Sequence, residues 1–236
     1  MRNTTTIALK EFKFYLTSPM AYVVTGIFLV LTGFFFSISS ATYSRTSIAG
    51  FLGIGSILLL LLASVLTMRL LAEERKMGTL ELLLTAPVRD SEVIAGKFLG
   101  SLGILTVMLV LTFYYPLLLM WFGDPDMGPI TTGYLGLFLL GGVSLAVGLF
   151  ASSLTSNQLV AAVVAGGILG ALWFLGSAAD LLPGALGEVF NFLSISYYFP
   201  DFMRGVIDTR GIIYYLSITV LFLFLAIRSL ESSRWS

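Results

Sequence analysis

The chain has 236 residues, of which 57% are hydrophobic and only 11% are charged, with 13 basic and 13 acidic side chains. A soluble domain carries about 25% charged residues, so this composition excludes an ordinary soluble protein and predicts an integral membrane protein. The chain has no cysteine and no histidine, which excludes disulfides, the usual zinc ligands, and catalysis by either residue type.

Six apolar stretches are each long enough to cross a bilayer, which takes about 20 helical residues. They cover residues 20–39, 51–71, 97–121, 132–153, 158–179 and 211–230. Pro116 is expected to kink the third stretch. We therefore predict an all-α, polytopic fold in which residues 1–236 form a single transmembrane domain, with no room for a soluble enzyme domain.

Residues 1–19 precede the first predicted span. Within residues 6–17 the apolar side chains fall on one helical face and the charged ones on another. Twelve residues are too few to span, so this segment reads either as a helix lying in the membrane interface or as a frayed cytoplasmic tail.

Lysine and arginine are distributed unequally between the two sides of the predicted membrane domain. One side holds Arg2, Lys10, Lys13, Arg69, Arg75, Lys76, Arg89, Lys97, Arg228 and Arg234, and the other holds Arg45, Arg204 and Arg210. Because basic residues concentrate in cytoplasmic loops, we expect both termini and residues 72–96 to face the cytoplasm.

Residues 180–210 do not resemble an ordinary loop, because apolar side chains and six charges are mixed throughout. The segment is too apolar for water and too charged to span. It is expected to form a short re-entrant or interfacial helix pair on the outer side, or a compact outer cap.

Small residues crowd the fourth and fifth predicted spans. Gly142 with Ala146, and Gly166 with Gly170, have the four-residue spacing that lets two helix backbones approach closely. These pairs predict helix packing, either inside one subunit or between two subunits.

Ten of the 26 charged residues lie between Arg69 and Lys97. A charge at the bilayer centre costs roughly 2.5–3.5 kcal/mol on insertion scales, so this segment is expected to lie in water between the second and third spans. Residues 72–76 are expected to continue the second span, and Gly78 permits a backbone turn. Thr79 can cap a new short helix, and Asp90 or Ser91 can cap the helix that leads into the third span.

The loop sequence resembles a known element. Residues 73–97, EERKMGTLELLLTAPVRDSEVIAGK, are similar to the cytoplasmic loop of ABC-type-2 permeases, the membrane subunits of ATP-driven exporters. The resemblance implies a coupling helix that contacts an ATPase subunit. The residues expected to make that contact are Glu73, Glu74, Arg75, Gly78, Thr79, Leu80, Glu81, Leu82, Leu83 and Leu84.

Shorter segments extend the resemblance to the gliding-motility-type branch of that family. They are KEFKFYLTSPMAYVV, GDPDMGPI, GLFASSLTSNQLVAA, DFMRGVID and LESSRW. Without the resemblance, residues 72–96 could equally be a solvated loop that only separates two spans.

The resemblance implies how the chain is assembled and where it is located. The chain has no phosphate-binding loop of the Walker type, so it is expected to bind no cofactor itself, with ATP and Mg²⁺ bound by two copies of a separate cytoplasmic ATPase. A second permease, identical or related and with or without a large extracytoplasmic domain, is expected as a partner. The expected location is the bacterial cytoplasmic (inner) membrane, with lipid contacts and no nucleic acid.

Three functions are compatible with these observations. The first is a non-enzymatic permease that couples ATP hydrolysis in its partner to export. The second is an ATP-driven subunit that transmits force to an extracytoplasmic partner without moving a solute, which the absence of ionisable residues at mid-depth in the spans permits. The third, a membrane enzyme acting on lipids, is disfavoured because no catalytic constellation is present.

Overall fold

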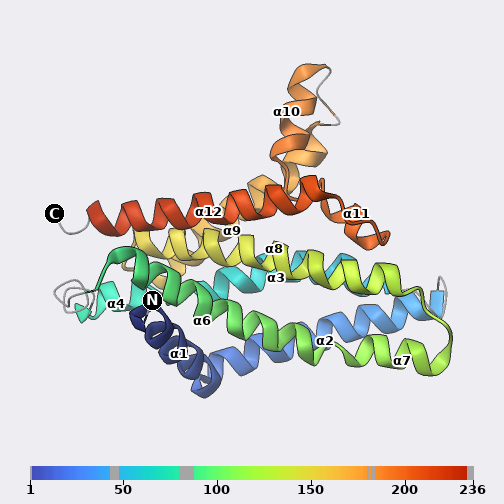
Figure 1. The fold of residues 1–236 in the computed structure, drawn as a ribbon, viewed down its shortest axis with the longest axis horizontal. Helices are drawn as coiled ribbons and strands as arrows, with labels where there is room; N and C mark the ends of the chain where they lie inside the picture. Colours follow the sequence, from blue (N-terminus) through green and yellow to red (C-terminus); the bar gives the residue numbers. More distant parts are fainter. Residues whose placement is uncertain (1, 43–47, 80–87, 180, 182–183, 233–236) are drawn as a thin grey trace.

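The structure is a computed structural model that describes residues 2–42, 48–79, 88–179, 181 and 184–232. Within these residues the fold is entirely α-helical (Figure 1). Six stretches of the described residues are long and apolar enough to cross a membrane, so the prediction of six spans is confirmed. The helices are α1 (Arg2–Thr17), α2 (Pro19–Thr42), α3 (Ala49–Thr67), α4 (Ala72–Lys76), α6 (Asp90–Leu111), α7 (Tyr114–Phe122), α8 (Met127–Leu154), α9 (Gln158–Ala179), α10 (Ala185–Leu193), α11 (Phe199–Met203) and α12 (Thr209–Ser232).

Helix α8 forms the centre of the bundle. In its most apolar segment 78% of the residues are buried. The helix contacts α3, α6, α9, α11 and α12. Glycines allow this close packing. A Cβ atom on Gly141 would lie 2.5 Å from the Leu105 side chain, and one on Gly148 would collide with Thr67. The missing side chains therefore let α3 and α6 approach the α8 backbone.

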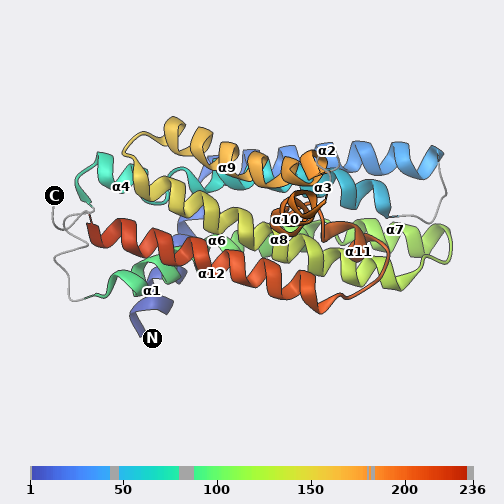
Figure 2. The ribbon, with the colours of Figure 1, turned by 90° about the horizontal axis from the view of Figure 1, so that it is seen from above.

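The two ends of the bundle differ. The beginning of α1, the whole of α4 and the end of α12 lie toward one end, which we call the α4 end (Figures 1 and 2). Helix α7 and the connected ends of α2 and α3 lie at the opposite end. The charged segment predicted between the second and third spans therefore begins at the same end as the start of α1 and the end of α12.

The second predicted span does not continue as one helix through Lys76. Helix α3 ends at Thr67, residues 68–71 form a turn, and α4 begins at Ala72. Residues 72–76 nevertheless extend the second span to Lys76, as expected. The interruption arises because a buried hydroxyl on α8 binds the backbone there.

The third predicted span is also interrupted, just before Pro116. Proline has no N–H to donate to the carbonyl four residues earlier. That carbonyl belongs to Thr112, and it accepts a hydrogen bond of 2.9 Å from the Tyr134 hydroxyl on α8. The predicted kink at Pro116 therefore takes the form of a break between α6 and α7.

Two local features of the charged segment can be compared with the sequence. Gly78 has φ of +69°, which confirms the predicted turn after α4. The helix that leads into the third span is preceded by Arg89, not capped by Asp90 or Ser91 as expected. The Glu92 carboxylate reaches back and accepts the Arg89 backbone N–H at 3.3 Å, so the acidic residue of the first turn provides the cap.

Residues 184–208 contain the predicted pair of short helices, α10 and α11. Helix α10 projects away from the long axis of the bundle (Figure 1). The segment is anchored by side chains of the spans: the Tyr215 hydroxyl donates to the Ile195 carbonyl at 2.8 Å, and the Thr132 hydroxyl donates to the Phe202 carbonyl at 2.6 Å. Apolar side chains of α10 remain exposed, among them Leu186, Val189 and Phe192.

Candidate functional site

Helix α1 packs along a row of glycines on α6. A Cβ atom on Gly96 would lie 2.7 Å from Ile7, one on Gly100 would lie 2.6 Å from Glu11, and one on Gly103 would lie 2.8 Å from Phe12. These three glycines have the i, i+4, i+7 spacing of a single helix face. The amino-terminal helix is therefore held tightly against the beginning of the third span.

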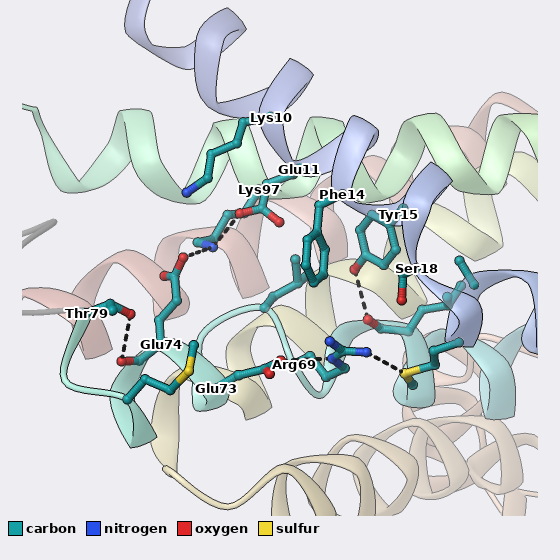
Figure 3. A pocket seen from close by; sticks show the side chains of 15 residues that line it. Lys10, Glu11, Phe14, Tyr15, Ser18, Arg69, Glu73, Glu74, Thr79 and Lys97 are labelled. Carbon is teal, nitrogen blue, oxygen red and sulfur yellow. Dashed lines mark hydrogen bonds and ion pairs between the residues drawn. The ribbon is translucent and has the colours of Figure 1, made fainter.

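A buried ion-pair network lies where α1, α4 and α6 meet. The Lys97 ammonium lies 2.7 Å from Oε1 of Glu11 and 2.9 Å from Oε1 of Glu74 (Figure 3). The Lys97 side chain is only 2% exposed, and the two carboxylate side chains are 10% and 21% exposed. We call these three residues the Lys97 network. Because the pairs are largely removed from water, they are screened less than surface pairs.

The second oxygen of Glu74 has no hydrogen-bond partner among the described residues, although it is buried. The network thus contains two carboxylates for one ammonium group. Lys10 lies nearby on α1 and points toward this region in Figure 3, and it makes no ion pair with any described residue. Lys10 is therefore a nearby cation that can balance the excess negative charge of the two carboxylates.

A second charged group joins α1 to the end of α3. The Arg69 Nε atom lies 2.9 Å from Oε2 of Glu73, and the guanidinium lies over the Phe14 ring at 5.4 Å from its centroid. Its Nη1 atom also lies 3.4 Å from the Met20 sulfur. Arg69 therefore contacts α1, the beginning of α2 and α4 together.

The Tyr15 hydroxyl provides a further contact between α1 and α3. It donates to the Leu66 carbonyl at 2.8 Å in the last turn of α3. Burial, reinforced by the Glu11 carboxylate, raises the pKa of Tyr15 above its usual value. The hydroxyl accordingly stays protonated and remains a donor.

Ser152 of α8 holds the turn between α3 and α4. Its Oγ accepts the backbone N–H groups of Leu71 and Ala72, both at 3.0 Å, and donates to the Met68 carbonyl at 3.1 Å. These backbone groups would otherwise be buried without partners, at a cost of roughly 1–3 kcal/mol each. One fully buried hydroxyl thus fixes the start of α4.

A cavity of about 520 Å³ lies between α1 and the α3–α4 connection (Figure 3). Its walls combine apolar side chains, such as Phe14, Leu66 and Leu70, with the charged groups described above. Such a lining suits an amphipathic molecule or a partner side chain. No group of three or more metal-ligating side chains occurs in the part of the chain that the structure describes.

The residues predicted to contact an ATPase fall into two groups. Glu73, Glu74, Arg75, Gly78 and Thr79 are described, and the first two turn toward the protein and form ion pairs there. The Thr79 hydroxyl donates to the Glu74 carbonyl at 3.3 Å. Leu80, Glu81, Leu82, Leu83 and Leu84 lie outside the described residues.

The four small residues predicted to pack helices have different surroundings. Ala146 is fully buried, and a Cβ atom on Gly142 would lie 4.0 Å from Leu102. A Cβ atom on Gly166 would reach only Ser64 at 4.0 Å, and one on Gly170 would meet nothing within 4 Å. The α8 pair thus faces this chain's own helices, whereas Gly170 faces open space.

The sequence alone does not show the roles of Glu11, Lys97 and Ser152. Lys97 is predicted only as a cytoplasmic-side basic residue at the start of the third span and the end of the family-like loop, and Glu11 only as part of the charged face of residues 6–17. A signal was present, because Lys97 directly follows Gly96 and precedes Gly100 by three residues. A charge inside a small-residue packing motif must be buried when another helix packs on that motif.

These observations define a polytopic helical membrane protein whose charged segment between the second and third spans is joined to an amino-terminal helix. The family model for ABC-2 family transporter proteins matches residues 5–182, and the chain belongs to that family. It is therefore the permease, or membrane subunit, of an ABC transporter, and such permeases lack ATPase activity and pair with an ABC ATPase. A search of curated proteins gave no significant match.

Proposed function

We propose that this permease couples ATP hydrolysis by a separate cytoplasmic ATPase to export across a bacterial inner membrane. The α4 end would face the cytoplasm, with both termini there, in line with the excess of lysine and arginine. Residues 79–84 would form the coupling helix that contacts the ATPase. The observation that carries this proposal is the family match together with the Gly78 turn, which follows α4 at the end of the bundle where α1 begins and α12 ends.

The proposed route of motion starts at the ATPase. ATP binding would bring two ATPase copies together, and each would displace the coupling helix of one permease. The displacement would then pass through the backbone of residues 77–79 into α4. Helix α4 is attached to α8 through Ser152 and to α6 through Lys97. Movement at the coupling helix would therefore reach the bundle through these contacts.

A second permease, identical or related, is proposed to pack against α2 and α9. In their most apolar segments only 28% and 17% of the residues are buried. Both helices lie along the same edge of the bundle in Figure 2. On α9 the unpacked face is formed by Leu159, Val163, Gly167, Gly170 and Phe174. Small residues on a membrane helix allow a second backbone to come close, whereas lipid contact requires none.

The test is co-purification from membranes with the ATPase encoded beside the permease. The coupling proposal predicts that Glu81→Lys reduces ATPase recovery or uncouples ATP hydrolysis from permease motion. Glu231→Lys on α12 is the matched control, because Glu231 forms an ion pair with Arg228 of its own helix turn. Equal ATPase recovery and equal hydrolysis in both variants would refute coupling through residues 79–84.

We also propose that the permease belongs to the gliding-motility-type branch, on the shorter matching segments. The alternative function is force transmission to an extracytoplasmic partner without solute transport. The absence of ionisable residues at mid-depth in the predicted spans permits it, since ion-coupled carriers place such groups there. A structure of the dimer distinguishes the two functions. A continuous cavity along the dimer axis supports export, whereas a closed and well-packed interface supports force transmission.

A further inference from the structure

We propose that Lys97 is a positioning residue that joins α1, α4 and α6 into one rigid unit, so that any displacement of α4 carries α1 with it. The inference rests on the proposed function, because there the motion of the ATPase arrives at α4. It goes further by assigning the amino-terminal helix a part in receiving that motion, through a side chain outside the coupling loop.

Helix α4 cannot fix its own position. It has five residues, little more than one turn, and isolated helices of this length are not stable in water. A four-residue turn precedes it, and Gly78 with its positive φ follows it. Contacts with the rest of the protein must therefore decide where α4 lies.

Three polar contacts hold α4. At its start, the N–H groups of Leu71 and Ala72 bind Ser152 of α8. Glu73 pairs with Arg69 in the preceding turn, and the carboxylate of Glu74, the middle residue of α4, binds Lys97 of α6 at 2.9 Å. The Lys97 contact lies beyond the turn and nearer the coupling loop, so it opposes rotation of α4 about its start.

Lys97 can hold α4 in position because its own side chain is enclosed by the protein. Its side chain is 2% exposed, and the glycines on either side, Gly96 and Gly100, are covered by α1. Its second bond, 2.7 Å to Glu11, comes from α1, which lies 86 residues away in sequence. The ammonium thus binds two elements that have no covalent connection near it.

Among the other charged groups around the cavity, Arg69 also links α1 to α4, because it pairs with Glu73 of α4 and its guanidinium lies over the Phe14 ring of α1. Arg69 is not part of α6, however, so it does not tie the two helices to the third span. Lys10 belongs to α1 and forms no ion pair with the described residues. Among the described side chains, only Lys97 forms ion pairs with both α1 and α4.

The chain contains no cysteine, so two introduced cysteines can be spin-labelled selectively. Lys13→Cys on α1 and Lys76→Cys on α4 replace exposed residues outside the Lys97 network. The distance between the labels is measured by electron paramagnetic resonance on the full chain in lipid nanodiscs. Measurements are made on the permease alone, with its ATPase, and with ATP trapped.

The comparison variant is Glu11→Gln, Glu74→Gln and Lys97→Met combined. It removes all three charges together, so no buried charge is left unpaired, and neutral replacements of buried ion networks are often tolerated. The matched control is Arg228→Met with Glu231→Gln, which removes an ion pair within α12.

A rigid unit predicts one narrow label distance that is the same in all three conditions. The triple variant is expected to lose the narrow distribution, and its complex is expected to lose the dependence of ATP hydrolysis on the permease while still assembling. The control is expected to behave as the unmodified chain. A wild-type distance that changes when ATP is trapped, or a triple variant with the wild-type distribution, would overturn the proposal.

Failure of the proposed function gives a different result. If no ATPase co-purifies with the wild-type permease, the coupling proposal fails, yet the label distances in the permease alone still test whether Lys97 holds α1 and α4 together. A narrow distance distribution in the wild type that broadens in the triple variant then supports the rigid unit without a role in coupling. Equal distance distributions in the wild type and the triple variant refute the rigid unit whatever the ATPase does.

Discussion

Gly100 of α6 and Glu11 of α1 lie so close that a Cβ atom on Gly100 would be 2.6 Å from the Cβ of Glu11. The same atom would lie 3.0 Å from the Ala8 backbone carbonyl, which cannot move independently of α1. Glycine at position 100 is thus required for the packing of α1 on α6, and this packing places the Glu11 carboxylate beside Lys97.

Replacement of Gly100 by alanine is expected to displace α1 and destabilise the permease. Overpacking of a well-packed contact costs about 1–3 kcal/mol, so the melting temperature of the detergent-solubilised protein should fall. Gly142→Ala on α8 is the matched control, because a Cβ atom there would meet only Leu102, at an ordinary contact distance of 4.0 Å. Equal melting temperatures for the two variants would contradict the close approach of α1 and α6.

Ser152→Ala is expected to loosen the turn between α3 and α4. The Leu71 and Ala72 N–H groups would lose their acceptor, which should cost roughly 1–3 kcal/mol. Hydrogen exchange at these two amides should accelerate, and mass spectrometry of the corresponding peptide measures it. Ser153→Ala serves as the control, because the Ser153 hydroxyl bonds to Phe150 within its own helix. Faster exchange in both variants alike would argue against a specific role for Ser152.

The sequence alone predicted the local features of this fold and missed its long-range ones. Residues 158–179 were predicted as a span and form α9 with the same bounds, because apolar composition and length suffice. The Gly78 turn was likewise predicted from one residue. The interruption at residues 68–71 was not, because it depends on Ser152, which lies 81 residues from Leu71.

The candidate site shows the same contrast between local features, which the sequence predicts, and long-range contacts, which it does not. Sequence similarity identified residues 73–84 as a candidate contact with the ATPase, but Glu73 and Glu74 turn inward to ion pairs. The direction of a side chain on a five-residue helix depends on its surroundings, and here α4 contacts α8 and α9 while Glu74 reaches Lys97 of α6. The Lys97 network required knowing that residues 11, 74 and 97 meet, which no local pattern encodes.

Lys97→Met alone is expected to be far more harmful than loss of a surface charge. It would leave the Glu11 and Glu74 carboxylates buried without their counter-ion, and breaking one side of a buried ion network costs about 3–5 kcal/mol. Arg228→Met breaks an exposed pair on α12, which is worth at most about 1 kcal/mol. Thermal unfolding in the same detergent compares them. Similar losses in both variants would show that the Lys97 network contributes no more than a surface pair.

Gly170→Leu is expected to prevent association with a second permease while leaving the single subunit folded. The side chain would project into open space on α9, so the melting temperature of the monomer should not change. At an interface where two backbones approach closely, however, a leucine side chain would hold the helices apart. Light scattering of the detergent complex should therefore show a shift from dimer to monomer. Val220→Leu, on the exposed face of α12, is the control and should leave the dimer intact. A stable dimer in the Gly170→Leu variant would place the second permease on another face.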